Sequence, residues 1–230
     1  MSGAMKRFEQ TLVFGRLGEQ FISQWLKRKG YGVIPSYAYS GKDGNKAPKL
    51  LFQREEFVVP DLDVCKLGKR FWLEIKTYGY APENRNHGCL VHGIPGRLYG
   101  DYLDVGAKSG CPVHLGVLEL CSRSFLTIAL ETARTILCTC PACRTNPRGC
   151  IGPMKQGVYF DRRSFRVQTV FDPSELNGIV SAWEKLNPGK DLALLAERQG
   201  RFHMRPSRTE RRQRSLFGPD GYGGRSDALG

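Results

Sequence analysis

Two acidic residues and a lysine fall on neighbouring extended segments in the first third of the chain. Asp61 follows Pro60, and Glu74 and Lys76 come 13 and 15 residues after Asp61. Side chains alternate along a strand, so Glu74 and Lys76 share one face, and a hairpin closed at Gly68 would place Asp61 beside Glu74 on that face. Two adjacent carboxylates repel each other unless a divalent cation lies between them, and Mg²⁺ prefers oxygen ligands of this kind. The spacing therefore predicts a site in which Mg²⁺ or Mn²⁺ activates a water that Lys76 orients or deprotonates.

The elements around these residues have the pattern of an α/β domain. Apolar residues at helical spacing predict helices, and apolar segments bounded by turn residues predict strands. The predicted order is a helix over 12–29, strands over 49–52, 56–64 and 70–77, a loop over 78–95, a helix over 98–108, and strands over 113–120 and 125–129. This αβββαβ order places Asp61, Glu74 and Lys76 on the second and third strands of the core. Without a metal, the same residues would form a salt-bridged pair of surface strands.

On these residues the chain resembles the PD-(D/E)xK nuclease superfamily. The match runs over residues 15–120 and rests on Pro60-Asp61, on Glu74-Ile75-Lys76 and on the order of helices and strands. The resemblance implies a restriction-endonuclease-like core over residues 1–130. It also implies a Mg²⁺- or Mn²⁺-dependent deoxyribonuclease that acts in DNA repair, recombination or restriction. The catalytic residues that it assigns are the metal ligands Asp61, Glu74 and Ile75, the last through its backbone carbonyl, and the lysine Lys76.

The first helix carries a further match. Gly15-Arg16-Leu17-Gly18-Glu19 resembles the start of a helix in Holliday-junction-resolvase-like members of the superfamily, in which a glutamate joins the metal site. The resemblance implies that Glu19 is catalytic, and it adds an alternative function, the resolution of branched DNA by a homodimer. Glu19 lies at the border of the apolar stripe of the helix, where a solvated glutamate is the other interpretation. Gly18 would let the helix approach the sheet closely.

Aromatic and histidine side chains follow the lysine. Tyr78 lies just beyond Lys76, and we expect it to contact DNA. Tyr102 falls on the next predicted helix, where packing of the helix against the sheet is the favoured interpretation. His92 lies in the predicted glycine-rich loop and is expected to be a surface residue.

Four cysteines fall within 13 residues, and they are Cys138, Cys140, Cys143 and Cys150. Four thiolates close a tetrahedral Zn²⁺ site, and a loop that buries so little could be held folded by a metal. The pattern predicts a structural zinc. The alternative is an iron–sulfur cluster of the kind that some nucleases of this superfamily carry, but those members usually draw one ligand from upstream of the nuclease core, and no cysteine precedes Cys65. Arg144 and Arg148 in the same loop are expected to touch DNA.

Two further regions complete the predicted organisation. Residues 131–200 are expected to hold the cysteine-rich loop, strands over 159–160 and 165–170, and helices over 173–186 and 191–199. Residues 201–230 are rich in Arg, Ser and Gly and are predicted to be a disordered basic tail. Three residues of the tail resemble the short peptides by which bacterial DNA-processing proteins dock into the sliding clamp: Gln213, Leu216 and Phe217.

The charge of the chain narrows the class of partner. Its 35 Lys and Arg residues outnumber 22 Asp and Glu residues, which gives a formal net charge of +13. A charge of this size favours a polyphosphate partner such as DNA, because each contact with a phosphate releases a counterion. No run of 18 apolar residues and no secretory signal can be read, so a cytoplasmic protein without a membrane span is expected. A non-catalytic, zinc-containing DNA-binding adaptor is the alternative from another functional class.

Overall fold

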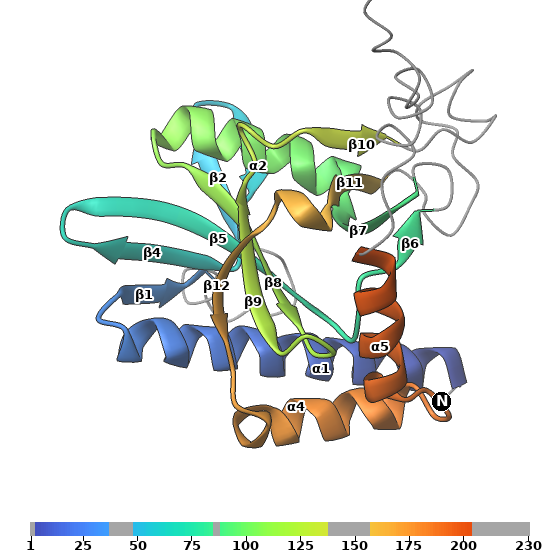
Figure 1. Cartoon of the computed structure of the whole chain (residues 1–230). Coiled ribbons are helices and arrows are strands. Elements are labelled where there is room, and N and C mark those ends of the chain that lie inside the picture. The colour runs from blue at the N-terminus through green and yellow to red at the C-terminus, as the bar shows by residue number, and fades with distance from the viewer. Residues whose placement is uncertain (1–2, 37–47, 85–87, 138–156, 204–230) are drawn as a thin grey trace, which may run out of the picture.

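A six-stranded mixed sheet forms the centre of the molecule (Figure 1). The computed structural model describes residues 3–36, 48–84, 88–137 and 157–203. The sheet order is β1-β4-β5-β8-β9-β12, with β5 and β8 parallel and every other neighbouring pair antiparallel. The strands are β1 (Gly32–Pro35), β4 (Leu62–Lys66), β5 (Lys69–Tyr78), β8 (Val113–Glu119), β9 (Ser124–Ala129) and β12 (Arg166–Val170). The chain is therefore a mixed α/β protein built on a central sheet.

Two helices cover one face of this sheet. α1 (Gly3–Arg28) and α4 (Pro173–Leu186) lie beneath it in Figure 1 and contact each other. Leu73 and Ile75 of β5 point into the core toward this helix pair. α4 begins as its sequence predicts: the Asp172 side chain accepts a hydrogen bond from the Ser174 amide at 2.9 Å, and the Glu175 side chain accepts one from the Asp172 amide at 3.1 Å. This capping box fixes the start of α4 below the sheet.

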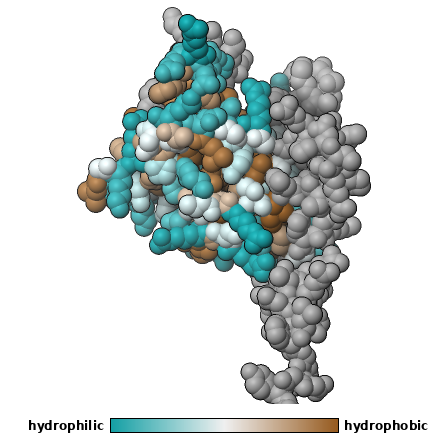
Figure 2. Space-filling view, turned by 90° about the horizontal axis from the view of Figure 1, so that it is seen from above, coloured by the Kyte–Doolittle hydropathy of each residue, from teal (hydrophilic) through white to brown (hydrophobic). Residues whose placement is uncertain are grey.

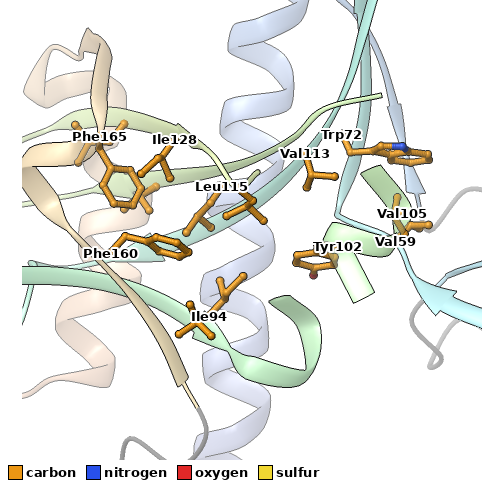
Figure 3. Close-up of a cluster of buried hydrophobic side chains, with 14 of the residues drawn as sticks. Val59, Trp72, Ile94, Tyr102, Val105, Val113, Leu115, Ile128, Phe160 and Phe165 are labelled. Carbon is orange, nitrogen blue, oxygen red and sulfur yellow. The ribbon is translucent and has the colours of Figure 1, made fainter. Parts of the chain in front are cut away.

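The opposite face carries α2 (Gly96–Ser109) and a second sheet of order β10-β11-β7-β6. The strands of this sheet are β10 (Thr135–Leu137), β11 (Gly157–Asp161), β7 (Cys89–Pro95) and β6 (Glu83–Asn84). Figure 3 shows the core on this side, where Tyr102 of α2 lies near Val113 and Leu115 of β8, and Phe160 and Phe165 pack farther along. The central sheet is thus buried on both faces.

Four smaller elements complete the described chain. β2 (Lys49–Phe52) and β3 (Glu55–Val58) form a separate hairpin next to α2, η2 (Arg162–Ser164) joins β11 to β12, and α5 (Leu192–His203) lies beside the second sheet (Figure 1). Seen from above, hydrophobic side chains gather toward the middle of the surface among hydrophilic ones (Figure 2). Among the described residues no helix is long and apolar enough to cross a membrane.

The expected αβββαβ order is present in the central sheet, but its first strand is a different segment. β1, at 32–35, pairs with β4, whereas the segment expected to be the first strand forms β2 of the separate hairpin. The strand expected over 56–64 is also wrong, because it divides into β3 and β4, which belong to different sheets. Pro60 has no amide hydrogen to donate, so the ladder breaks there. This break leaves Asp61 at the entrance to β4.

The loop expected over 78–95 contains strands β6 and β7. The Gly, Pro and His residues of this segment favour a loop in the sequence, but β7 is a largely buried strand. It is stabilised by pairing with β11, more than 60 residues later in the chain. β12 and α4 also follow the cysteine-rich segment in sequence, yet they join the central sheet and α1. Segments on both sides of residue 130 therefore share one sheet, and the division into units at 130 and 200 stays a prediction.

Candidate active site

The candidate site lies where β5 extends beyond β4. Leu62, the first residue of β4, is paired with Leu73, so from Glu74 onward β5 has β8 on one side and no described strand on the other. Asp61 fills the first position of this gap, because its Oδ2 accepts a hydrogen bond from the Ile75 amide at 2.8 Å. A side chain thus replaces the missing ladder bond and brings the Asp61 carboxylate next to Glu74.

Ser36, just after β1, holds the Pro60–Asp61 turn in place. Its amide donates to the Asp61 carbonyl at 2.8 Å, and its hydroxyl donates to the Pro60 carbonyl at 2.5 Å. Ser36 is fully buried. These bonds fix the backbone that carries the Asp61 carboxylate, and no local sequence pattern points to them because Ser36 is 24 residues from Pro60.

Glu74 and Lys76 form an ion pair at the open edge of β5. The Glu74 side chain is 2% exposed, the Lys76 side chain is 30% exposed, and the ammonium contacts Glu74 Oε1. Glu74 Oε2 is buried and has no hydrogen-bond partner among the described residues. An ionised oxygen left without a partner in the interior is costly, so this atom has an unfilled place for a proton or a cation.

The electrostatics of the cluster depend on burial and on crowding of like charges. Burial raises the pKa of Asp61 well above its usual value, and the charge of Glu74 raises it further. Burial works against the charge of Lys76, but the carboxylates of Glu74 and Asp61 outweigh it and raise the pKa of this lysine. Lys76 is therefore a cation, and Asp61 is held where a negative charge is disfavoured unless a further positive charge is added.

Glu19 approaches the same cluster from α1. Burial raises the pKa of Glu19, Lys76 opposes this rise and Glu74 adds to it, so the three groups interact electrostatically. Gly18 makes the approach feasible, because a Cβ atom at this position would lie 1.8 Å from Thr77 Oγ1 of β5. The expected close contact of the helix with the sheet at Gly18 is confirmed, and Glu19 is brought to the edge of the cluster rather than into bulk solvent.

Tyr102 belongs to the site as well as to the core. Burial raises the pKa of its hydroxyl, and the charges of Glu74 and Asp61 add to the effect, so the phenol faces these carboxylates. Packing against the sheet was the expected role, and Tyr102 does pack there (Figure 3). Its second role, facing the acids, had only one signal in the sequence: a tyrosine near the middle of the helix that directly precedes β8.

Tyr78, in contrast, turns toward the second sheet. Its hydroxyl donates to the Gly93 carbonyl at 2.9 Å, and its ring stacks on His92 with a centroid distance of 5.2 Å. Burial raises the pKa of Tyr78. The hydroxyl is thus used within the protein, and contact of Tyr78 with DNA stays a prediction.

His92 is not the surface residue that its loop-like sequence suggested. Its ring is buried, and Nε2 lies 2.9 Å from Glu119 Oε2. Glu119 is also bound by Arg162, whose Nε and terminal nitrogen lie 2.7–3.0 Å from the carboxylate oxygens. This His92–Glu119–Arg162 cluster joins the end of β8 to β7 and η2. The sequence carried one signal for it, a single acid at the end of a mostly apolar strand.

The residues present suit a magnesium-like ion better than a metal that needs a closed protein cage. Among the residues that the structure describes, no group of three His, Cys, Asp or Glu side chains is gathered so as to hold a metal ion by itself. Mg²⁺ is usually bound by one or two carboxylates and keeps several waters. Asp61, Glu74 and Glu19 with Lys76 carry two net negative charges when all are ionised, and Glu74 Oε2 has no hydrogen-bond partner within the described part of the chain. This donor set fits such an ion.

Several predicted site residues lie outside the described part of the chain. They are the cysteines Cys138, Cys140, Cys143 and Cys150, the arginines Arg144 and Arg148, and the tail residues Gln213, Leu216 and Phe217. Zinc binding, DNA contact by the cysteine-rich loop and clamp binding by the tail therefore stay predictions.

Comparisons with known proteins find likenesses among solved structures. No protein-family model matches the sequence, and no curated protein matches it either. One solved structure with a similar arrangement is that of Hjc from Archaeoglobus fulgidus, a Holliday junction resolvase from an archaeal hyperthermophile. The TM-score is 0.41 at 10% sequence identity, and the likeness covers 65% of this chain and 90% of that one. A function for the present chain rests on its own residues.

Proposed function

We propose that the chain is a Mg²⁺- or Mn²⁺-dependent endonuclease of the PD-(D/E)xK type that hydrolyses phosphodiester bonds in DNA. The observation that carries the proposal is the convergence of Asp61, Glu74 and Lys76 at the edge of β5 on which no described strand pairs, with the Asp61 carboxylate bonded to the Ile75 amide. The formal charge of +13 supports a polyanionic substrate. DNA is the partner that we assign.

Each residue of the cluster has a role in this proposal. Asp61 and Glu74 would hold the ion, with the Ile75 carbonyl as a further ligand, and Glu19 would assist from α1. The ion, when bound, polarises a phosphoryl oxygen and lowers the pKa of a water. Lys76 orients that water or a phosphate oxygen as a cation, because its raised pKa makes removal of a proton by its amine unfavourable.

The deciding experiment compares Lys76→Ala with Lys69→Ala. Lys69 lies at the exposed start of the same strand and serves as the matched control. Cleavage is assayed on linear, nicked, flapped and four-way DNA with Mg²⁺ or Mn²⁺, and DNA affinity is measured separately in EDTA. We expect Lys76→Ala to lose cleavage on the order of 100-fold or more at unchanged affinity, and Lys69→Ala to cleave like the wild type.

The same panel separates the alternatives. Preferential cleavage of the four-way substrate favours a branched-DNA resolvase, for which the position of Glu19 beside Lys76 and Glu74 is the supporting observation; a homodimer is then expected in solution. If the wild type and Lys76→Ala bind DNA equally well and neither cleaves any substrate, the non-catalytic DNA-binding adaptor is the correct function.

A further inference from the structure

A cavity of about 380 Å³ opens next to the candidate active site, between α1, the end of β5 and α4. This volume is within the range of sites that take small organic groups. Its lining is mostly aromatic and apolar, with a few polar groups; the residues that matter here are Phe14, Thr77, Tyr78, Tyr80, Trp183 and Asn187. Of these residues, Tyr78 alone is expected from the sequence to contact DNA, and its hydroxyl is bonded to the Gly93 carbonyl.

The cavity and the proposed catalytic cluster share strand β5, with Thr77 facing α1 and Lys76 on the opposite face of the strand. Thr77 and Tyr78 follow Lys76 on β5, and Tyr80 lies two residues beyond the end of this strand, in a bend. On α1, Phe14 lies five residues before Glu19, about 7.5 Å along the helix axis. Since only a few residues of one strand separate Lys76 from the cavity, we expect a single DNA strand with a phosphate at Lys76 to reach the cavity within a few nucleotides.

The walls of the cavity differ in rigidity. Trp183 is 4% exposed and packs closely against the backbone at Gly79, where a Cβ atom would lie 2.3 Å from the indole nitrogen. This wall is tightly packed. Tyr80 is only partly buried, so part of its ring is accessible. The accessible aromatic surface is what a nucleobase needs, because bases stack on aromatic side chains with little regard to sequence.

The ammonium group of Lys190 lies close to the ring of Tyr80. Lys190 Nζ lies 5.7 Å from the centroid of Tyr80, near the limit of a cation–π contact, and 3.3 Å from Asn187 Oδ1. The ammonium is therefore held by one neutral group and by a loose ring contact, and no acidic side chain among the residues that the structure describes forms an ion pair with it. From this position it can turn to a phosphate while the ring receives the attached base.

We propose that this cavity binds an unpaired nucleotide of the DNA strand beside the cleaved bond, with the base on Tyr80 and its phosphate at Lys190. The inference rests on the proposed function and narrows its substrate class to DNA that contains a single-stranded segment. A base inside a duplex is not available to the cavity, since it would first have to leave the stack.

The test uses the full-length protein and a DNA duplex with a single-stranded overhang, in EDTA so that binding is read without cleavage. 2-Aminopurine is placed at each overhang position in turn, because its fluorescence falls when it stacks on an aromatic ring. Tyr80→Leu removes the ring and keeps most of the volume, and Tyr80→Phe keeps the ring. Tyr31→Leu is the matched control, because Tyr31 is also partly buried and carries Lys66 4.4 Å over its ring, but it lies at the opposite end of α1.

We expect the wild type, Tyr80→Phe and Tyr31→Leu to quench 2-aminopurine at one or two overhang positions. Tyr80→Leu should lose this quenching and bind overhang DNA roughly 5- to 100-fold more weakly, with unchanged affinity for blunt duplex. Equal quenching and equal affinities for Tyr80→Leu and the wild type would overturn the inference. So would an equal loss of affinity for overhang and blunt DNA.

The outcome is independent of hydrolysis. If the wild type cleaves DNA but shows no position-specific quenching, the proposed endonuclease activity is supported and the proposed nucleotide-binding cavity is rejected. If position-specific quenching occurs but no substrate is cleaved, the cavity is supported as a single-strand binding site and the proposed endonuclease activity is rejected. The melting temperature of Tyr80→Leu, compared with that of Tyr31→Leu, establishes that both variants fold.

Discussion

Replacing Glu119 by glutamine should destabilise the fold strongly, although the residue lies outside the proposed catalytic cluster. The Glu119 side chain is completely buried and receives hydrogen bonds from Arg162 and from the Ser122 hydroxyl, with His92 Nε2 at 2.9 Å. Burial by itself would raise the pKa of Glu119, but the hydrogen bonds and charges of His92 and Arg162 outweigh it and lower the pKa to about 2.

The lowered pKa sets both the size and the sign of the effect. The carboxyl titrates near 4.5 in the unfolded chain and near 2 in the folded one, a difference that corresponds to about 3 kcal/mol. Because the folded-state pKa is the lower of the two, this stabilisation is complete above about pH 4.5 and is lost as the pH falls toward 2. Glutamine cannot ionise, so the variant should be less stable by about 3 kcal/mol at pH 7 and should lack this acid-dependent loss.

Urea unfolding, followed by far-UV circular dichroism at pH 7 and in steps down to pH 3, measures both quantities. Glu55→Gln is the control, because Glu55 makes an exposed ion pair with Lys108 whose loss should cost less than about 1 kcal/mol. Two results would refute the reasoning: equal free energies of unfolding for Glu119→Gln and the wild type at pH 7, or the same slope against pH in both proteins.

Three further predictions concern the proposed site and the cysteine-rich loop. Asp61→Asn should raise the melting temperature in EDTA by a few degrees, because it removes a buried negative charge that lies close to other carboxylates. The same variant should lose both cleavage and stabilisation by Mg²⁺. The control Asp63→Asn should lower the melting temperature instead, because Asp63 is ion-paired with an arginine. Gly18→Ala should lower the free energy of unfolding by about 1–3 kcal/mol and slow cleavage, because the added methyl group would clash with Thr77. Thr77→Gly in the same chain should restore part of the stability. Additive losses of stability in the double variant would contradict a direct clash. Metal analysis of the purified protein should find about one zinc, carried by the cysteines of residues 138–150, and less than about half an equivalent together with a brown chromophore would indicate an iron–sulfur cluster.

Elements whose signals are local were predictable from the sequence. α4 starts at Pro173 as expected, because its capping box joins residues only two or three positions apart. β5 is one residue longer at each end than the predicted strand. It was predictable because its own residue types favour an extended conformation, so the prediction does not depend on contacts with distant segments. The common face of Glu74 and Lys76 follows in the same way from alternation along one strand.

Features that join distant segments were not predictable in this way. The strand over 32–35 is short and half exposed, and only its pairing with β4 makes it part of the central sheet. The second sheet depends on the pairing of β7 with β11, and the His92–Glu119–Arg162 cluster depends on three elements that meet only in the folded chain. Such contacts are stabilised by burial, which a local pattern does not encode.

The sequence by itself determined which groups are available for chemistry: two acids and a lysine at strand spacing, in a chain whose positive charge suits a polyphosphate. Only the tertiary structure decided the relative positions of these groups. The break at Pro60 aims the Asp61 carboxylate at the Ile75 amide, and the close approach at Gly18 brings Glu19 to the cluster. Residue type and alternation are properties of the chain, whereas the distance between two carboxylates depends on how helices and strands pack.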